Sequence, residues 1–136
     1  MKVSLACAVL SSMLLMGCDQ ATSVADPSLE QTKAAEVAYQ DLRKGHFDEF
    51  LNHLDPKLQA HFQENPKLMQ KFSRVIPQGD YKSKTLMVKS FDQRSEFKVS
   101  YEIAYPGNLV QYDVSFDKPN GSTKIHNLNI RVFGGS

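Results

Sequence analysis

The chain has 136 residues, which is enough for one ordinary domain and too few for two. It contains 16 Lys and Arg against 15 Asp and Glu, so its formal net charge at pH 7 is +1. Proteins that bind nucleic acids concentrate positive charge on one surface. This balanced composition excludes a strongly basic binder of that kind, and we expect no nucleic-acid partner.

The first 17 residues have the pattern of a secretory signal peptide. Lys2 gives the start a positive charge, and every residue from 3 to 16 is apolar or small. This stretch of ~14 residues is shorter than the ~20 apolar residues that span a bilayer. The pattern therefore predicts a cleaved signal that ends at residue 17, and Cys7 leaves with it.

Residues 15–18, Leu-Met-Gly-Cys, resemble the lipobox of bacterial lipoprotein signal peptides. In that family an aliphatic residue and a small residue precede an invariant cysteine. The resemblance implies diacylglyceryl transfer to the Cys18 thiol, cleavage after Gly17, and acylation of the new amino terminus. Met16 departs from the family pattern, since Ala, Ser or Thr is commoner there. The alternative is an ordinary signal peptide beside an incidental Cys18.

Lipidation of Cys18 implies a membrane anchor. One fatty chain gives only marginal binding, whereas the two or three chains of a lipoprotein anchor it stably. The resemblance thus places the protein in the bacterial cell envelope, lipid-anchored and facing the periplasm. Asp19 and Gln20 resemble the signal that retains enterobacterial lipoproteins in the inner membrane. We therefore favour the inner membrane, while the outer membrane fits the sorting rules of other bacteria.

Residues 18–27 are expected to form a short lipidated tether, and residues 28–136 a single domain. Ser28 and Gln31 form a capping-box pattern, which satisfies free backbone amides at the start of a helix. Small and apolar residues then recur at helical spacing, and Gly45 supplies a left-handed stop. These signals predict a long helix over residues 29–44.

About three short helices are predicted over the next thirty or so residues. Apolar residues recur there at helical spacing. Asp55-Pro56 and Asn65-Pro66 each combine a capping residue with the residue best tolerated at the first helical position. Pro77 ends this helical half of the domain.

Beyond residue 79 the hydrophobic period changes to two, which is typical of half-buried strands. Asn120-Gly121 is a strong hairpin signal before the last of these strands. Apolar and polar residues alternate along three stretches, residues 97–105, 110–116 and 127–132.

An earlier strand over about residues 81–92 is also predicted, but its pattern does not decide which of its side chains face the core. Leu86 and Val88 would point one way, Met87 and Phe91 the other. Helices followed by a run of antiparallel strands predict an α+β fold. We expect a long N-terminal helix plus short helices packed on one face of a curved antiparallel sheet of about four strands.

This order of elements, with the segment Leu-Arg-Lys-Gly-His-Phe-Asp-Glu-Phe at residues 42–50, resembles small bacterial lipoproteins of the nuclear transport factor 2-like (cystatin-like) superfamily. The resemblance covers about residues 28–133. It implies a strongly bent sheet wrapped around the long helix, forming a cone with a pocket at its mouth. Many such domains bind ligands or partners without catalysis, and a few are isomerases or dehydratases, so the fold alone does not assign a function.

The best candidate for a pocket combines one histidine with three tyrosines. His126 shares the apolar face of the last strand, so it should point toward the helices near one end of the sheet. Tyr101, Tyr105 and Tyr112 lie on the apolar faces of the neighbouring strands, and each brings a hydroxyl that needs a partner. Such a mixture is typical of ligand sites, and an imidazole there could act as a base near neutral pH. The alternative is a histidine at the core edge that bonds a tyrosine.

Two other groups of polar residues are weaker candidates. His46, His53 and His61 fall within a short span, but helix geometry and Pro56 keep them from converging on one point. We therefore expect no metal and no cofactor. A polar row on the outward faces of the last two strands is either a solvated surface or a flat surface for a protein partner; it comprises Gln111, Asp113, Asn127, Asn129 and Arg131.

The sequence predicts a membrane-anchored envelope lipoprotein with a non-catalytic binding domain for a protein partner or a small apolar ligand. Lipidation confines a protein to a surface, which favours assembly over the turnover of a diffusing substrate. The alternative is a small isomerase- or dehydratase-like enzyme that uses His126 in a tyrosine-lined pocket. The sequence offers no obvious acid–base pair, which argues against catalysis.

Overall fold

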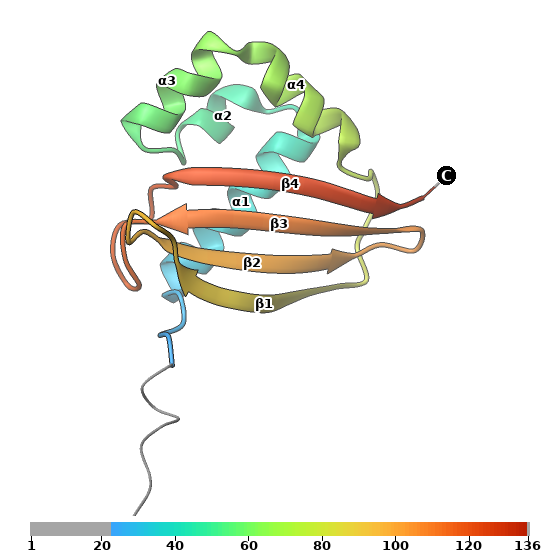
Figure 1. The fold of residues 1–136 in the computed structure, drawn as a ribbon. Coiled ribbons are helices and arrows are strands. Elements are labelled where there is room, and N and C mark those ends of the chain that lie inside the picture. The colour runs from blue at the N-terminus through green and yellow to red at the C-terminus, as the bar shows by residue number, and fades with distance from the viewer. Residues whose placement is uncertain (1–22, 136) are drawn as a thin grey trace, which may run out of the picture.

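The computed structural model describes residues 23–135 of the chain. Within this range four helices are followed by a four-stranded antiparallel sheet (Figure 1). The predicted α+β class and the predicted antiparallel sheet of four strands are therefore confirmed. Cys18, Asp19 and Gln20 lie outside the described residues, as does the signal peptide. No helix among the described residues is long and apolar enough to cross a membrane.

Helix α1, Leu29–Lys44, begins at the capping box that the sequence indicates. Gln31 N donates to Ser28 Oγ and Ser28 N donates to Gln31 Oε1, each over 3.0 Å. The helix ends at Gly45, whose φ of 79° is left-handed and favours glycine. The face that α1 buries consists of Gln31, Ala35, Ala38, Tyr39 and Leu42.

Three shorter helices follow: α2 (Phe47–Leu51), α3 (Pro56–Glu64) and α4 (Pro66–Val75). The predicted cap of α3 is confirmed, since Asp55 Oδ1 accepts from Leu58 N over 2.8 Å. The matching prediction for Asn65 is wrong, because its side chain does not cap α4. Asn65 Nδ2 instead donates to His61 O over 2.8 Å, which closes the end of α3.

The strands β1 (Ser83–Phe91), β2 (Phe97–Ala104), β3 (Asn108–Phe116) and β4 (Asn127–Gly134) lie side by side in chain order. A register shift between Leu86 and Val88 settles the facing of β1. Leu86 pairs with Tyr101 on the inner face, whereas Val88 pairs with Ser100 on the outer face. Leu86 and Val88 therefore point to opposite faces, not to the same one, because the extra residue Met87 interrupts the alternation.

Helix α1 crosses behind the sheet, and α3 and α4 lie beyond the edge formed by β4 (Figure 1). The short helices thus extend the core past that edge; the prediction that they would pack on the sheet face with α1 is wrong in this respect. Phe62 of α3 contacts Phe50 of α2 and Phe72 of α4 through its ring. A parallel bridge between Leu54 and Ile125 ties the turn before α3 to the segment that leads into β4.

Candidate functional site

The three predicted pocket tyrosines lie together in one buried cluster. Tyr101 and Tyr112 stack with ring centroids 6.2 Å apart, and Tyr112 donates to Ala35 O over 2.8 Å. The hydroxyls of Tyr105 and Tyr39 are 2.7 Å apart. Tyr39 of α1 was not predicted, although its helical spacing from Ala35 and Leu42 on the buried face of α1 was available as a signal.

All four rings of this cluster are at most 6% exposed, so they fill the space between α1 and the sheet. Burial raises the pKa of Tyr112 and of Tyr101, and both phenols stay neutral. Tyr101 Oη has no hydrogen-bond partner with good geometry among the described residues. The hydroxyls of Tyr39 and Tyr105 satisfy each other inside the core, so they do not face solvent.

His126 lies apart from the tyrosines, at the end of the sheet that faces the start of α3. Its Nδ1 is 2.6 Å from Glu96 Oε2, and its Nε2 is 3.8 Å from Asp55 Oδ2. Tyr112 pairs with Ile130, which is four residues from His126, or ~13 Å along an extended strand. The structure therefore does not bring His126 together with the tyrosines, and its hydrogen bond is to a carboxylate.

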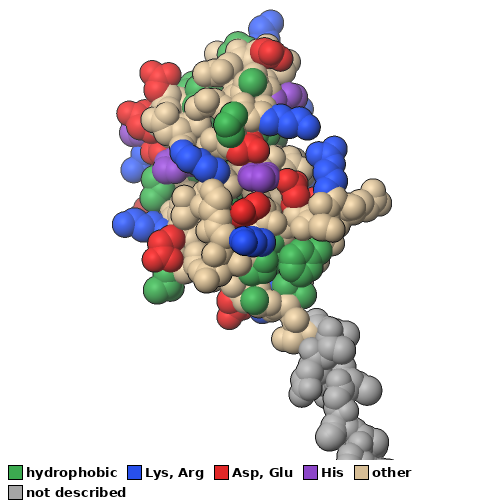
Figure 2. Space-filling view, turned by 90° about the vertical axis from the view of Figure 1, so that its left-hand side faces the viewer, with side chains coloured by type: hydrophobic (Ala, Val, Ile, Leu, Met, Phe, Trp, Pro, Cys, Tyr) green, Lys and Arg blue, Asp and Glu red, His purple; other side chains and the backbone are tan. Residues whose placement is uncertain are grey.

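A second group of histidines and a carboxylate centres on Asp41 of α1. Asp41 Oδ2 is 3.1 Å from His53 Nε2, and Asp41 Oδ1 is 3.8 Å from His46 Nδ1. His61 is exposed on α3, against the ring of Phe62. Figure 2 shows histidine and carboxylate side chains close together over this end of the molecule. In the described part of the chain, no three His, Cys, Asp or Glu side chains are placed to hold a metal ion.

The outer face of the sheet is the surface that no helix covers in Figure 1, and we call it the open sheet face. It holds a hollow of about 200 Å³ whose rim includes Met87, Val88 and Phe133. These three side chains are 55%, 52% and 47% exposed, although they are large and apolar. The bulge in β1 exposes Met87 and Val88 together, a feature that strict alternation does not predict.

Three members of the predicted polar row, Arg131, Gln111 and Asp113, lie at or beside this hollow and are joined by hydrogen bonds. Arg131 Nη2 donates to Gln111 Oε1 over 3.1 Å, and Gln111 Nε2 donates to Asp113 Oδ1 over 3.2 Å. A second hollow of about 250 Å³ continues from Asp113 toward Asn127. The open sheet face therefore combines an apolar rim with ordered polar groups.

Comparison of the chain with protein-family models, with curated proteins and with solved structures found no match.

Proposed function

We propose that the protein is a lipid-anchored lipoprotein of the bacterial cell envelope whose domain binds a protein partner and does not catalyse a reaction. The lipobox-like residues before Cys18 support the anchor, and Asp19 with Gln20 favours the inner membrane. The observation that carries the binding role is the open sheet face, where large apolar side chains are exposed beside a polar row.

Two properties of this face favour a protein partner over a small apolar ligand. Its apolar hollow of about 200 Å³ is smaller than the ~300–1,000 Å³ of typical ligand pockets. Met, Phe and Arg are enriched in protein interfaces, and Met87, Phe133 and Arg131 all lie on this face. The hydrogen bonds of Gln111 hold the neighbouring polar groups in place before any partner arrives.

Photocrosslinking tests this role with a matched pair of valines. Val88 on the open sheet face is 52% exposed, and Val75 at the end of α4 is 42% exposed. A benzophenone amino acid replaces one or the other in cells that produce the full lipoprotein. We expect Val88 to give one protein adduct that Val75 does not, and Phe133→Asp to reduce it by about tenfold, since interface anchors contribute that much or more.

Identical adducts from the two positions, or none from Val88, would contradict the proposed binding face. An adduct of Val88 with a small molecule in place of a protein would favour the apolar-ligand reading. Mass spectrometry of the adduct distinguishes these outcomes.

The alternative of an isomerase- or dehydratase-like enzyme draws on the short contact between His126 and Glu96. A carboxylate that orients an imidazole is a common acid–base arrangement. Asp55 faces the second ring nitrogen, however, and the tyrosines that would line a substrate pocket lie in the core. The two functions predict different outcomes for His126→Gln. A binding role leaves the crosslinking from Val88 unchanged, whereas a catalytic activity would be lost with the imidazole.

We also propose that the domain has the cone-like arrangement of the nuclear transport factor 2-like superfamily, with α1 as the long helix inside a curved sheet. The hydrogen bonds from Tyr112 to Ala35 and between Tyr105 and Tyr39 support this, because they join α1 to β3 and to the end of β2. An experimental structure would test it through the curvature of the sheet around α1.

A further inference from the structure

We infer that one end of the domain, which carries Leu29 and Phe91, rests on the lipid surface to which Cys18 anchors the chain. The inference depends on the proposed lipid anchor and adds an orientation to it. Leu29 is 84% exposed and Phe91 is 52% exposed, and neither belongs to the open sheet face. We call the surface around these two side chains the tether end.

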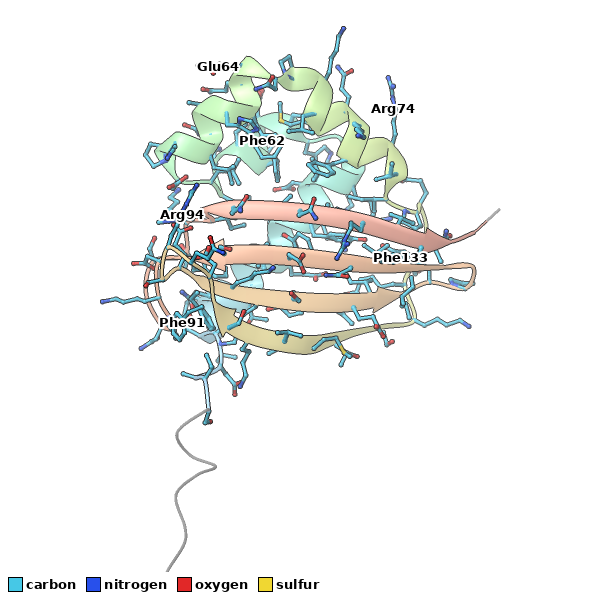
Figure 3. All side chains as sticks on the ribbon, in the orientation of Figure 1. Phe62, Glu64, Arg74, Phe91, Arg94 and Phe133 are labelled. Atoms are coloured by element: carbon cyan, nitrogen blue, oxygen red, sulfur yellow. The ribbon has the colours of Figure 1, made fainter. Side chains whose placement is uncertain are left out.

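The first described residues bring Leu29 and Phe91 to the same end of the molecule. Val24 packs against the core, and Asp26 Oδ1 is 2.7 Å from Lys89 Nζ on β1. Only Pro27 and Ser28 separate Asp26 from Leu29, while Lys89 and Phe91 lie on the same side of β1 because they are two residues apart. Figure 3 shows Phe91 at one end of the sheet, and the first described residues, blue in Figure 1, lie at that same end.

The length of the intervening chain limits how far this end can stand from the membrane. Six residues lead from Cys18 to Val24, and an extended chain covers at most ~3.3–3.6 Å per residue. A lipid on Cys18 therefore holds the packed Val24 within ~20 Å of the headgroups, which is less than the ~30 Å that the nine residues of β3 span. The tether end is then the part of the domain nearest the bilayer.

The chemistry of the tether end fits a lipid surface. Leu and Phe are among the residues that enter the boundary between headgroups and acyl chains. The nearest charges are Asp26 and Lys89, which pair with each other, and the carboxylates of Glu30 and Asp92, so contact does not rely on attraction to anionic lipid. Figure 2 shows hydrophobic side chains gathered at the lower end of the described surface. In this orientation the open sheet face does not lie against the bilayer, so an envelope partner can reach it.

Tryptophan fluorescence can test the docking because the chain contains no Trp. Leu29→Trp, Phe91→Trp and the control Phe133→Trp each give a single reporter in the lipidated full protein. The proteins are reconstituted in vesicles of phosphatidylethanolamine and phosphatidylglycerol, with brominated or ordinary acyl chains. Interfacial side chains sit ~5–10 Å into the boundary, so we expect bromine to remove about half of the emission at positions 29 and 91 and little at 133.

Flotation of the same vesicles separates this inference from the anchor on which it rests. Flotation of the lipidated protein, with loss of flotation in Cys18→Ala, supports the anchor. If the protein floats but quenching at positions 29 and 91 equals that at 133, the anchor stands and the docked orientation is overturned. If the protein does not float, both the anchor and the orientation are overturned.

Discussion

Glu36 shows how individual residues stabilise the domain near the tyrosine cluster. Its carboxylate is 2.6 Å from Lys84 Nζ on β1, and Tyr81 donates to it over 3.0 Å. Burial raises the pKa of Glu36, but the Lys84 ammonium, together with Gln40 and Tyr81, more than offsets this effect. The pKa of Glu36 is therefore held below its usual value, and the charged form stabilises the fold.

Replacing Glu36 by Gln should make the free energy of unfolding depend less on pH in the acid range. Because the pKa of Glu36 is lower in the folded state, its contribution is present above the unfolded pKa near 4.5 and is lost as the pH falls through the folded value. We expect Glu36→Gln to reduce the free energy of unfolding more at pH 7 than at pH 3. Urea denaturation at both pH values measures this, with the exposed Glu49→Gln as the control. An equal loss at both pH values would contradict the electrostatic role of Glu36.

Gln31 shows how one side chain can join two elements that are distant in sequence. Its role in the capping box of α1 follows from the sequence, but its full burial does not. Gln31 Nε2 donates to Lys118 O over 2.9 Å and to Ser122 O over 3.1 Å, while Oε1 accepts from Asn120 N over 3.0 Å. The start of α1 is thereby fixed to the loop between β3 and β4.

The change Gln31→Leu keeps much of the side-chain volume but removes every one of these hydrogen bonds. Unpaired polar groups in a buried site cost ~1–3 kcal/mol, so we expect a loss of about 2 kcal/mol in the free energy of unfolding. Chemical denaturation measures the loss, and Gln70→Leu on the exposed side of α4 should cost little by comparison. A similar result for both variants would show that the loop does not depend on Gln31.

At the scale of the whole molecule, the four tyrosines of the buried cluster are a neutral part of the core that joins α1 to the sheet. Burial raises the pKa of each of the chain's five tyrosines, Tyr39, Tyr81, Tyr101, Tyr105 and Tyr112. Each phenol therefore favours the folded state while it is protonated. This contribution is complete below the unfolded pKa near 10 and is lost as the pH rises through the folded values.

An alkaline titration should consequently show no gradual ionisation of the four buried tyrosines, Tyr39, Tyr101, Tyr105 and Tyr112, in the folded protein. We expect most of the phenolate absorbance to rise in one cooperative step that coincides with the loss of circular dichroism, above the usual pKa near 10. The unfolded protein in denaturant should titrate smoothly at the ordinary value. Ionisation of several tyrosines before the circular dichroism changes would show that the cluster is open to solvent.

The sequence by itself determined the class of elements, several of their ends and the face on which most side chains lie. Alternation and helical spacing are local properties, so Ser28, Gly45 and Asp55 could be assigned from their neighbours, and the polar row could be placed on the outer face. Only the tertiary structure decided how far apart two residues of one face lie, as with His126 and Tyr112. It also decided the bulge at Met87, the second role of Gln31 and the position of α3 and α4 beyond β4. These features depend on register and on packing between distant segments, which no local period encodes.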